Sequence, residues 1–237
     1  MRTPLVALAL AGAVLAPGAP AHAQAYQCAV PGSVSVPRIA PDGPARRMAV
    51  TGYSLNLSWS PEYCRGREGS AADRMQCSGR SGRFGLILHG LWPEGGESRW
   101  PQWCPTARRP SAELLRRNMC LTPSAQLLAH EWAKHGSCMA RTPEGYFKAA
   151  RILWDSLALP DLDRLSRRQG LTAGAIRQAF TDGNLAWSNE MVGIDLNERG
   201  WFEGYRLCYG KDFMPARCGK ARFGPPDSAS AKIWRGL

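Results

Sequence analysis

Histidine is scarce in this sequence, with four among 237 residues, and we expect one of the four, His22, to be removed with an N-terminal segment. The other three lie in two short stretches, 88–93 and 130–138. Histidine is the usual general acid or base because its unperturbed pKa lies near neutrality. Histidines scattered through a core would not gather in this way. We therefore predict that the two stretches are the halves of one active site, which the fold brings together.

Long apolar segments are also lacking. The one candidate, Leu5–Leu15, follows Arg2 and is too short to span a bilayer. It precedes Ala21-His22-Ala23, and this order of positive charge, apolar run and small-x-small site is typical of a secretory signal. We expect residues 1–23 to be removed on export to the periplasm or the extracellular medium, leaving a soluble protein without a membrane span.

Paired Cys-x-x-Cys motifs of the zinc-ribbon kind are absent, which disfavours a metal site built from cysteines. The eight cysteines are even in number. Because the signal directs them to an oxidising compartment, we expect four disulfides.

Acidic residues are few, 19 Asp and Glu against 30 Lys and Arg, which gives a formal charge of +11. A charge of this size favours a polyanionic partner, either nucleic acid or a membrane surface. A basic exported protein with no such partner remains open on charge alone.

The order of the predicted elements favours an α+β fold, because strands and helices do not alternate as they do in βαβ units. Residues 24–48, rich in Pro, Gly and Ala, predict an irregular N-terminal arm, and 49–237 are expected to form a single domain. Apolar patterns and capping residues predict the remaining elements. Strands are expected at 50–59, 84–88, 190–195 and 201–209, and helices at 111–119, 122–136, 142–159 and 172–180. The strand at 84–88 is expected to end at His89, and residues 93–110 to form a loop.

The helix that carries the second histidine stretch has an unusual face. Each helical residue advances by about 100°, so His130, Glu131, Lys134 and His135 project within an arc of about 140°. An acid, a cation and two imidazoles packed so closely are costly unless a ligand or a partner uses them. Ion pairing on an exposed helix would explain Glu131 and Lys134, but it does not explain the histidines.

A zinc hydrolase is the nearest alternative, because His130-Glu131 begins like the His-Glu-x-x-His motif. That motif needs two histidines one helical turn apart to share an ion. Here the second histidine comes five residues after the first, and Lys134 stands where the second ligand belongs. An ammonium cannot ligate and would repel the metal, so we expect no metal and no cofactor.

Phosphodiester cleavage by an internal nucleophile uses two histidines, a lysine and a carboxylate without a metal. RNA carries that nucleophile as its 2′-hydroxyl. One neutral imidazole accepts the hydroxyl proton, while a second, protonated imidazole gives a proton to the departing 5′-oxygen. A cation stabilises the charge on the phosphoryl oxygens. The product is a 2′,3′-cyclic phosphate, and DNA is inert because it lacks the hydroxyl.

These residues resemble the ribonuclease T2 family. His89-Gly90-Leu91-Trp92-Pro93 and the stretch His130–Cys138 look like its two active-site segments, in the right order and about forty residues apart, and 57–64 resembles its first core strand with the loop that follows. The resemblance implies an α+β fold with an antiparallel sheet packed against helices. It also implies endonucleolytic cleavage of single-stranded RNA with little base specificity.

The resemblance implies a role for each matching residue. His135 matches the general base and His89 the general acid, Glu131 and Lys134 match residues that support the transition state, and His130 matches a phosphate-binding histidine. Trp92 falls where the family places an aromatic residue at the primary base site. Further base-binding candidates are Glu94, which stands where many relatives have aspartate, together with Trp100 and Trp103.

The resemblance also suggests two disulfides, Cys104–Cys138 and Cys208–Cys218, the first of which we expect to hold the two catalytic halves together. The short loop between Cys64 and Cys77 predicts a third disulfide that joins these two residues. Cys28–Cys120 follows by elimination. We expect a monomer whose partner is its RNA substrate. A catalytically idle RNA-binding or signalling protein on the same scaffold is the alternative, although such a protein is expected to have lost a histidine.

Overall fold

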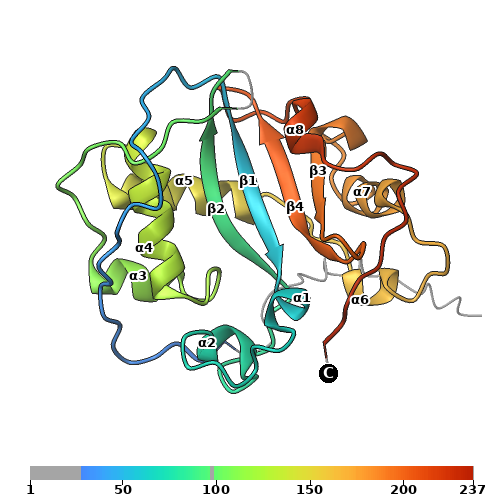
Figure 1. Ribbon diagram of the computed structural model, residues 1–237, viewed down its shortest axis with the longest axis horizontal. Helices are drawn as coiled ribbons and strands as arrows, with labels where there is room; N and C mark the ends of the chain where they lie inside the picture. The colour runs from blue at the N-terminus through green and yellow to red at the C-terminus, as the bar shows by residue number, and fades with distance from the viewer. Residues whose placement is uncertain (1–27, 97–98, 237) are drawn as a thin grey trace, which may run out of the picture.

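The centre of the molecule is a four-stranded antiparallel sheet with the order β2-β1-β4-β3 (Figure 1). A computed structural model describes residues 28–96 and 99–236, so the expected signal segment and the first residues of the arm lie outside it. The strands are β1 (Gly52–Trp59), β2 (Leu86–Glu94), β3 (Val192–Leu196) and β4 (Phe202–Tyr209). The α+β architecture expected from the sequence is confirmed.

The two faces of this sheet differ because apolar and polar residues alternate along its strands. The apolar face forms the core with α5 (Pro143–Asp155), which runs behind the sheet, and α7 (Ala173–Thr181) beside β3 (Figure 1). Its fully buried side chains include Leu55, Leu57, Leu91, Ile194, Tyr205 and Leu207. The opposite face carries Ser54, Asn56, Ser58, Asp195 and Arg206. Within residues 28–96 and 99–236 no long helix covers this second face, and the candidate active site lies on it.

The other helices lie around the edges of the sheet. Next to β2 are α3 (Ala112–Asn118) and α4 (Ala125–Lys134), and α4 continues into a 3-10 turn, η1 (Gly136–Cys138) (Figure 1). The remaining helical segments are short: α1 (Ser60–Cys64), α2 (Arg74–Cys77), α6 (Leu162–Leu165), η2 (Asn189–Met191) and α8 (Lys220–Phe223). None of the described helices is long and apolar enough to cross a bilayer.

Strand β2 does not end at His89 but continues to Glu94. A β-bulge shifts the pairing of this strand by one residue, and the strand continues beyond it. Asn56 pairs with Gly90, and the next residue of β1, Leu57, pairs with Leu88. His89 is therefore the extra residue of the bulge. Both His89 and Gly90 face the polar side, while Leu88 and Leu91 stay in the core.

Start and end points of two helices also differ from expectation. Helix α4 begins at Ala125 with Ser124 as its cap, because the hydroxyl of the expected cap, Thr122, donates instead to the carbonyl of Leu88. Helix α5 ends at Asp155 rather than near 159.

All eight cysteines form disulfides in the expected pairs, Cys28–Cys120, Cys64–Cys77, Cys104–Cys138 and Cys208–Cys218. Residues 28–48 contain no helix or strand, but they are fastened to the body of the protein. The first disulfide ties the beginning of this arm to the turn after α3, and paired backbone hydrogen bonds join Arg46 to Gln102. The arm consequently reaches the end of α4, where the second histidine stretch lies.

Candidate active site

His89 is held on a strand whose outer edge is hydrogen-bonded rather than free. The amide of Leu88 donates to the carbonyl of Leu121 at 2.9 Å, and the amide of Leu91 donates to the hydroxyl of Tyr146 at 3.1 Å. The Nδ1 atom of His89 is 2.9 Å from the hydroxyl oxygen of Ser58 on β1. These contacts fix the ring while leaving 34% of the side chain exposed to solvent.

Glu131 lies directly over Gly90, and its position explains that glycine. A Cβ atom at residue 90 would overlap the carboxylate of Glu131. The carboxylate is buried, accepts a hydrogen bond of 2.6 Å from the indole Nε1 of Trp92, and lies 3.5 Å from Nε2 of His89. Burial alone would raise the pKa of Glu131, but the bond and charge of His89, with help from His135 and Trp92, lower it instead. Glu131 is therefore ionised at neutral pH.

The contact between Glu131 and His89 lowers the pKa of the carboxylate and raises the pKa of the imidazole. Burial alone would lower the pKa of His89, but its interaction with the Glu131 carboxylate outweighs this effect, and Asp195 adds to it. The pKa of His89 is raised above its usual 6.5. The ring consequently favours the protonated form.

His135 occupies the position directly after α4, and its environment is apolar. Only 3% of the residue is exposed, and its ring stacks on Trp92 with 4.8 Å between ring centroids and 17° between planes. Among the described residues, nothing forms a hydrogen bond with its Nδ1. Burial, which outweighs the attraction of Glu131, lowers the pKa of His135 to about 4. The ring is neutral at pH 7.

The helical face predicted from the sequence is divided into two rows, each formed by residues four apart. Glu131 and His135 turn inward to Trp92, whereas His130 and Lys134 remain partly exposed at the rim. The outer row meets a carboxylate that sequence reasoning missed, Asp42 of the arm. Its Oδ2 accepts a hydrogen bond of 2.7 Å from Lys134 Nζ and lies 3.8 Å from His130 Nε2.

No sequence signal marks Asp42, because it lies in a Pro-rich segment far from both histidine stretches. It enters the site because the arm is fastened on either side of it. The interaction with Lys134, although partly offset by burial, lowers the pKa of Asp42, with a further hydrogen bond from Trp103. Asp42 is therefore a carboxylate beside His130, expected from the resemblance to bind phosphate, and Lys134, expected to support the transition state.

The four predicted base-binding residues do not form one surface. Trp92 is the central aromatic residue, between His135 and, edge-on at 5.7 Å, His89. Trp103 lies on the α4 side, where its Nε1 donates to Asp42 Oδ1 at 3.0 Å and its ring meets His130 edge-on at 5.3 Å. It forms a wall of the His130–Lys134 site.

Glu94 and Trp100 lie together at the far end of β2. The carboxylate of Glu94 accepts a hydrogen bond of 2.6 Å from Ser54 and pairs with Arg222 at 2.7 Å. The guanidinium of Arg222 lies 5.0 Å from the ring centroid of Trp100, and Arg46 lies 5.6 Å from it. The negative charge of Glu94 is thus balanced by Arg222, and the ring of Trp100 lies between two arginines.

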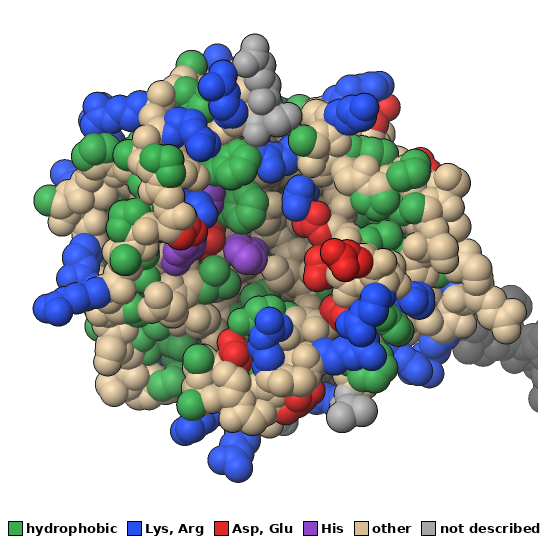
Figure 2. Space-filling model, in the orientation of Figure 1, with side chains coloured by type: hydrophobic (Ala, Val, Ile, Leu, Met, Phe, Trp, Pro, Cys, Tyr) green, Lys and Arg blue, Asp and Glu red, His purple; other side chains and the backbone are tan. Residues whose placement is uncertain are grey.

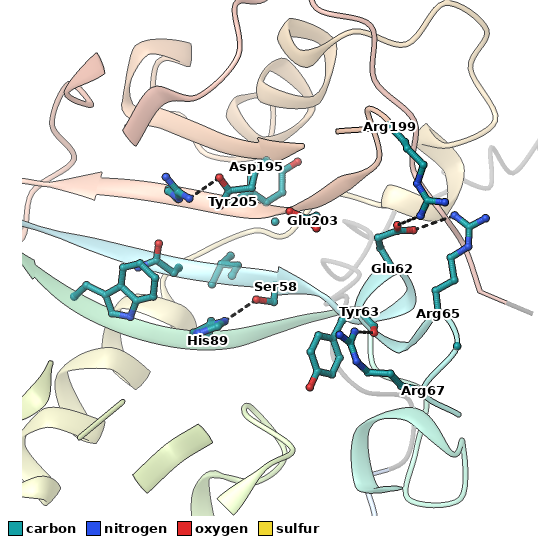
Figure 3. Close-up of a pocket in the computed structure, with 16 residues that line it drawn as sticks. Ser58, Glu62, Tyr63, Arg65, Arg67, His89, Asp195, Arg199, Glu203 and Tyr205 are labelled. Atoms are coloured by element: carbon teal, nitrogen blue, oxygen red, sulfur yellow. Dashed lines mark hydrogen bonds and ion pairs between the residues drawn. The ribbon is translucent and has the colours of Figure 1, made fainter. Parts of the chain in front are cut away.

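His89 opens into two cavities. One, of about 640 Å³, extends over the polar face of the sheet and is also lined by Trp92 and Ser58 (Figure 3). The other, of about 410 Å³, lies between β2 and α4 and includes His130. Figure 2 shows the histidines in the hollow at the centre of this face, with Lys and Arg side chains distributed around it. Among the described residues, no group of three or more His, Cys, Asp or Glu side chains is placed to hold a metal ion.

The fold and the site define a class: an antiparallel α+β protein with four disulfides whose sheet and adjoining helix bring two histidines and a buried carboxylate together. The model of the ribonuclease T2 family matches residues 51–175. This chain belongs to that family.

Relatives by sequence agree. The chain is 35% identical over 127 residues to a "Probable ribonuclease" of Haemophilus influenzae, covering 48% of this chain and 46% of that protein. It is 38% identical over 101 residues to a "Ribonuclease" of Aeromonas hydrophila, covering 43% of each. The chain therefore matches just under half the length of these two relatives.

Solved structures show the same fold over more of the chain. An RNase-related protein from Calystegia sepium superposes with a TM-score of 0.61 at 18% identity, covering 78% of this chain and 98% of that one. Trichomaglin, described as an S-like ribonuclease, superposes with a TM-score of 0.60 at 20% identity over the same shares. At this level of identity the likeness concerns the fold.

Proposed function

We propose that this protein is an endoribonuclease that cleaves single-stranded RNA with little base specificity, without a metal, through a 2′,3′-cyclic phosphate. One arrangement carries the proposal: His89 lies 3.5 Å from the Glu131 carboxylate, whereas His135 is buried against Trp92 with an unpartnered Nδ1, so the pKa values of the two histidines shift in opposite directions. A pair of titratable groups pushed apart in this way supplies a base and an acid at the same pH. Membership of the ribonuclease T2 family supports the choice of RNA as the substrate.

His135, neutral at pH 7, is the general base. It accepts the proton of the 2′-hydroxyl as the oxygen attacks phosphorus, and the bond to the 5′-oxygen breaks. His89, kept protonated by Glu131, donates its proton to that departing oxygen. A water molecule opens the cyclic phosphate in a second step, in which the two histidines exchange roles.

Lys134 and His130 bind the phosphoryl oxygens in this mechanism, because a cation and an imidazole side by side stabilise the charge that accumulates there. In the free protein, the carboxylate of Asp42 lies against both Lys134 and His130. The base 5′ to the cleaved bond stacks on Trp92, and Glu94, Trp100 and Trp103 contribute to base binding at the margins. Stacking without a set of directed base-edge contacts is consistent with low base specificity.

The first experiment is digestion of RNA and of matched DNA by the oxidised protein in the presence of EDTA, with the product ends identified by mass spectrometry. Cleavage of RNA alone, with 2′,3′-cyclic phosphate ends, is the expected result. Activity that appears only after zinc is added would favour a zinc hydrolase. Tight RNA binding without cleavage would favour the idle scaffold.

Substitutions separate the roles of the three histidines. His89→Ala and His135→Ala should each remove most turnover, whereas His130→Ala should act mainly on substrate binding. General acid–base residues contribute roughly 10²–10⁴-fold each, which sets the size of the expected loss in kcat. Equal and small losses in all three variants would contradict the assignment.

A further inference from the structure

The larger cavity continues well beyond the catalytic residues. It begins at His89 and Trp92, crosses the polar face of the sheet past Ser58, and ends at α1 and the segment that follows it (Figure 3). Figure 3 shows three arginines, Arg65, Arg67 and Arg199, gathered at this far end. The roles proposed for the histidines use only the near end of the cavity.

An aromatic residue and a guanidinium are stacked at the arginine end. Tyr63 is 40% exposed, and the guanidinium of Arg67 lies 4.4 Å from its ring centroid while donating to its backbone carbonyl. Among the described residues, no carboxylate forms an ion pair with Arg67. Exposed tyrosine rings and arginine planes are surfaces on which unpaired RNA bases stack, and an arginine without a carboxylate partner is available to phosphate.

The other two arginines share one carboxylate, that of Glu62. Arg65 lies 3.7 Å and Arg199 3.9 Å from its oxygens, so two positive charges share one negative charge. Arg65 is fixed by two tryptophan rings, whose centroids lie 5.1 and 4.6 Å from its guanidinium. Arg199 is 67% exposed, so its weak pairing leaves it free to turn toward a ligand.

The wall between His89 and the arginines has a different character. Asp195 pairs with Arg206 at 2.7 Å, and burial, with a contribution from neighbouring carboxylates, raises the pKa of the adjacent Glu203. Two residues that line the cavity, Asn56 and Glu62, each have a buried side-chain oxygen, Oδ1 and Oε2 respectively, without a hydrogen-bond partner among the described residues. These acceptors favour a ligand that brings N–H or O–H donors, while the carboxylates keep phosphate away from the middle of the cavity.

We propose that this cavity binds the RNA strand on the 3′ side of the cleaved bond, beyond the departing nucleotide. Arg67 and Arg199 each contact a backbone phosphate, Tyr63 supports a base, and the acceptor-lined wall meets base amino groups or ribose hydroxyls. The direction follows from the proposed function: His89 protonates the departing 5′-oxygen, so the strand that leaves lies on the side of His89 away from His135. The subsite makes longer RNA a better substrate than a dinucleotide.

Binding tests the subsite separately from catalysis. The probes are 2′-O-methyl oligonucleotides, which have no free 2′-hydroxyl to attack, and the variants are Arg67→Ala and Arg199→Ala. Each should weaken binding of a hexamer by roughly tenfold and flatten the salt dependence of log K by about 0.7. Arg117→Ala is the control, because it removes an equally exposed arginine from α3, which contributes nothing to this cavity. If the control weakens binding as much as Arg67→Ala, no local subsite exists.

Cleavage tests the direction. The substrates are 2′-O-methyl strands with a single ribonucleotide, extended on its 3′ side, on its 5′ side, or on neither, so that one bond is cut. The Arg67 and Arg199 variants should lose the gain in kcat/KM that 3′ extension gives the unmodified protein, and should cut the shortest substrate normally. Loss of the gain from 5′ extension instead would overturn the direction. A protein that binds the probes through Arg67 but cuts none of these substrates would contradict the proposed endoribonuclease while leaving the binding surface intact.

Discussion

The contrast between the two inner histidines depends on how each ring meets Glu131. His89 has its Nε2 3.5 Å from the carboxylate and a hydroxyl oxygen near Nδ1, whereas His135 presents its ring face to Trp92 and has an unpartnered Nδ1. One ring is therefore stabilised as a cation, and the other is stabilised as a neutral base. A single carboxylate, turned toward one ring by the indole of Trp92, separates the two roles.

The pH dependence of kcat/KM should be bell-shaped. Activity requires neutral His135, which is available above its pKa of about 4, and protonated His89, which is available below a pKa raised above 6.5. The rate should therefore rise through about pH 4, form a plateau, and fall at a pH above 6.5. Initial rates on a dinucleoside phosphate at constant ionic strength measure both limbs. A profile that lacks the acidic limb near pH 4, or that lacks a basic limb altogether, would contradict the pair.

Gly90→Ala should inactivate the protein with the histidines unchanged. The new methyl group would overlap the Glu131 carboxylate and push it away from His89. We expect a loss of about 10²-fold in kcat, since small displacements in a site cost this much, and about 1–3 kcal/mol of stability. The basic limb of the pH profile should also move to lower pH. Gly69→Ala is the control, because a Cβ there meets no atom within 4 Å; normal activity in Gly90→Ala would show that Glu131 is not required there.

The catalytic candidates could be found from the sequence because each is a rare residue type inside a short motif. The sequence also indicated that His130, Glu131, Lys134 and His135 share one helical face. It did not indicate that this face divides into an inner and an outer row, because that division depends on what packs against it. Asp42 and Ser58 were missed for a related reason: their importance comes only from contacts with residues distant in the chain.

At the level of elements, the N-terminal arm packs against the candidate site and contributes a side chain to it. Its disulfide to Cys120 and its backbone pairing with Gln102 place Asp42 against Lys134. The composition of this segment predicts irregular structure. Composition says nothing about where an irregular segment is fastened, so the position of the arm had to come from the structure.

Asp42→Asn should strengthen phosphate binding. The substitution keeps the shape and an acceptor for Trp103 but removes the negative charge beside Lys134 and His130. We expect KM for a dinucleotide and the inhibition constant of inorganic phosphate to fall by about two- to tenfold, with kcat unchanged, since the site is partly screened by solvent. Steady-state kinetics at one ionic strength measure all three. A fall in kcat with KM unchanged would instead make Asp42 a positioning residue for Lys134.

On the scale of the whole molecule, basic side chains surround a central hollow beside which a smaller set of carboxylates lies (Figure 2). A formal charge of +11 favours long-range attraction of a polyanion, whereas the carboxylates of Glu131, Asp195 and Asp42 act on the groups next to them within the site. Long-range attraction and local chemistry are thus assigned to different sets of charges.

Cleavage of long RNA should therefore slow steeply as salt concentration rises. Each phosphate that the protein neutralises on a single strand contributes about −0.7 to the slope of log K against log salt concentration. The slope for kcat/KM on polymeric RNA should be several times that for a dinucleoside phosphate, which serves as the internal control. Equal slopes for both substrates would show that the basic surface takes no part in capture.

The bulge at His89 also determines whether the histidine motif could be transferred to another protein. Residues of β2 before the bulge point to the core when their numbers are even, and those after it when their numbers are odd. In a regular strand without the bulge, strict alternation from Leu88 would instead turn Leu91 out to water and Trp92 into the core. If the five-residue motif were grafted onto a regular strand, its sequence would be kept but its side chains would face the wrong sides of the sheet. The host strand must therefore contain the same β-bulge.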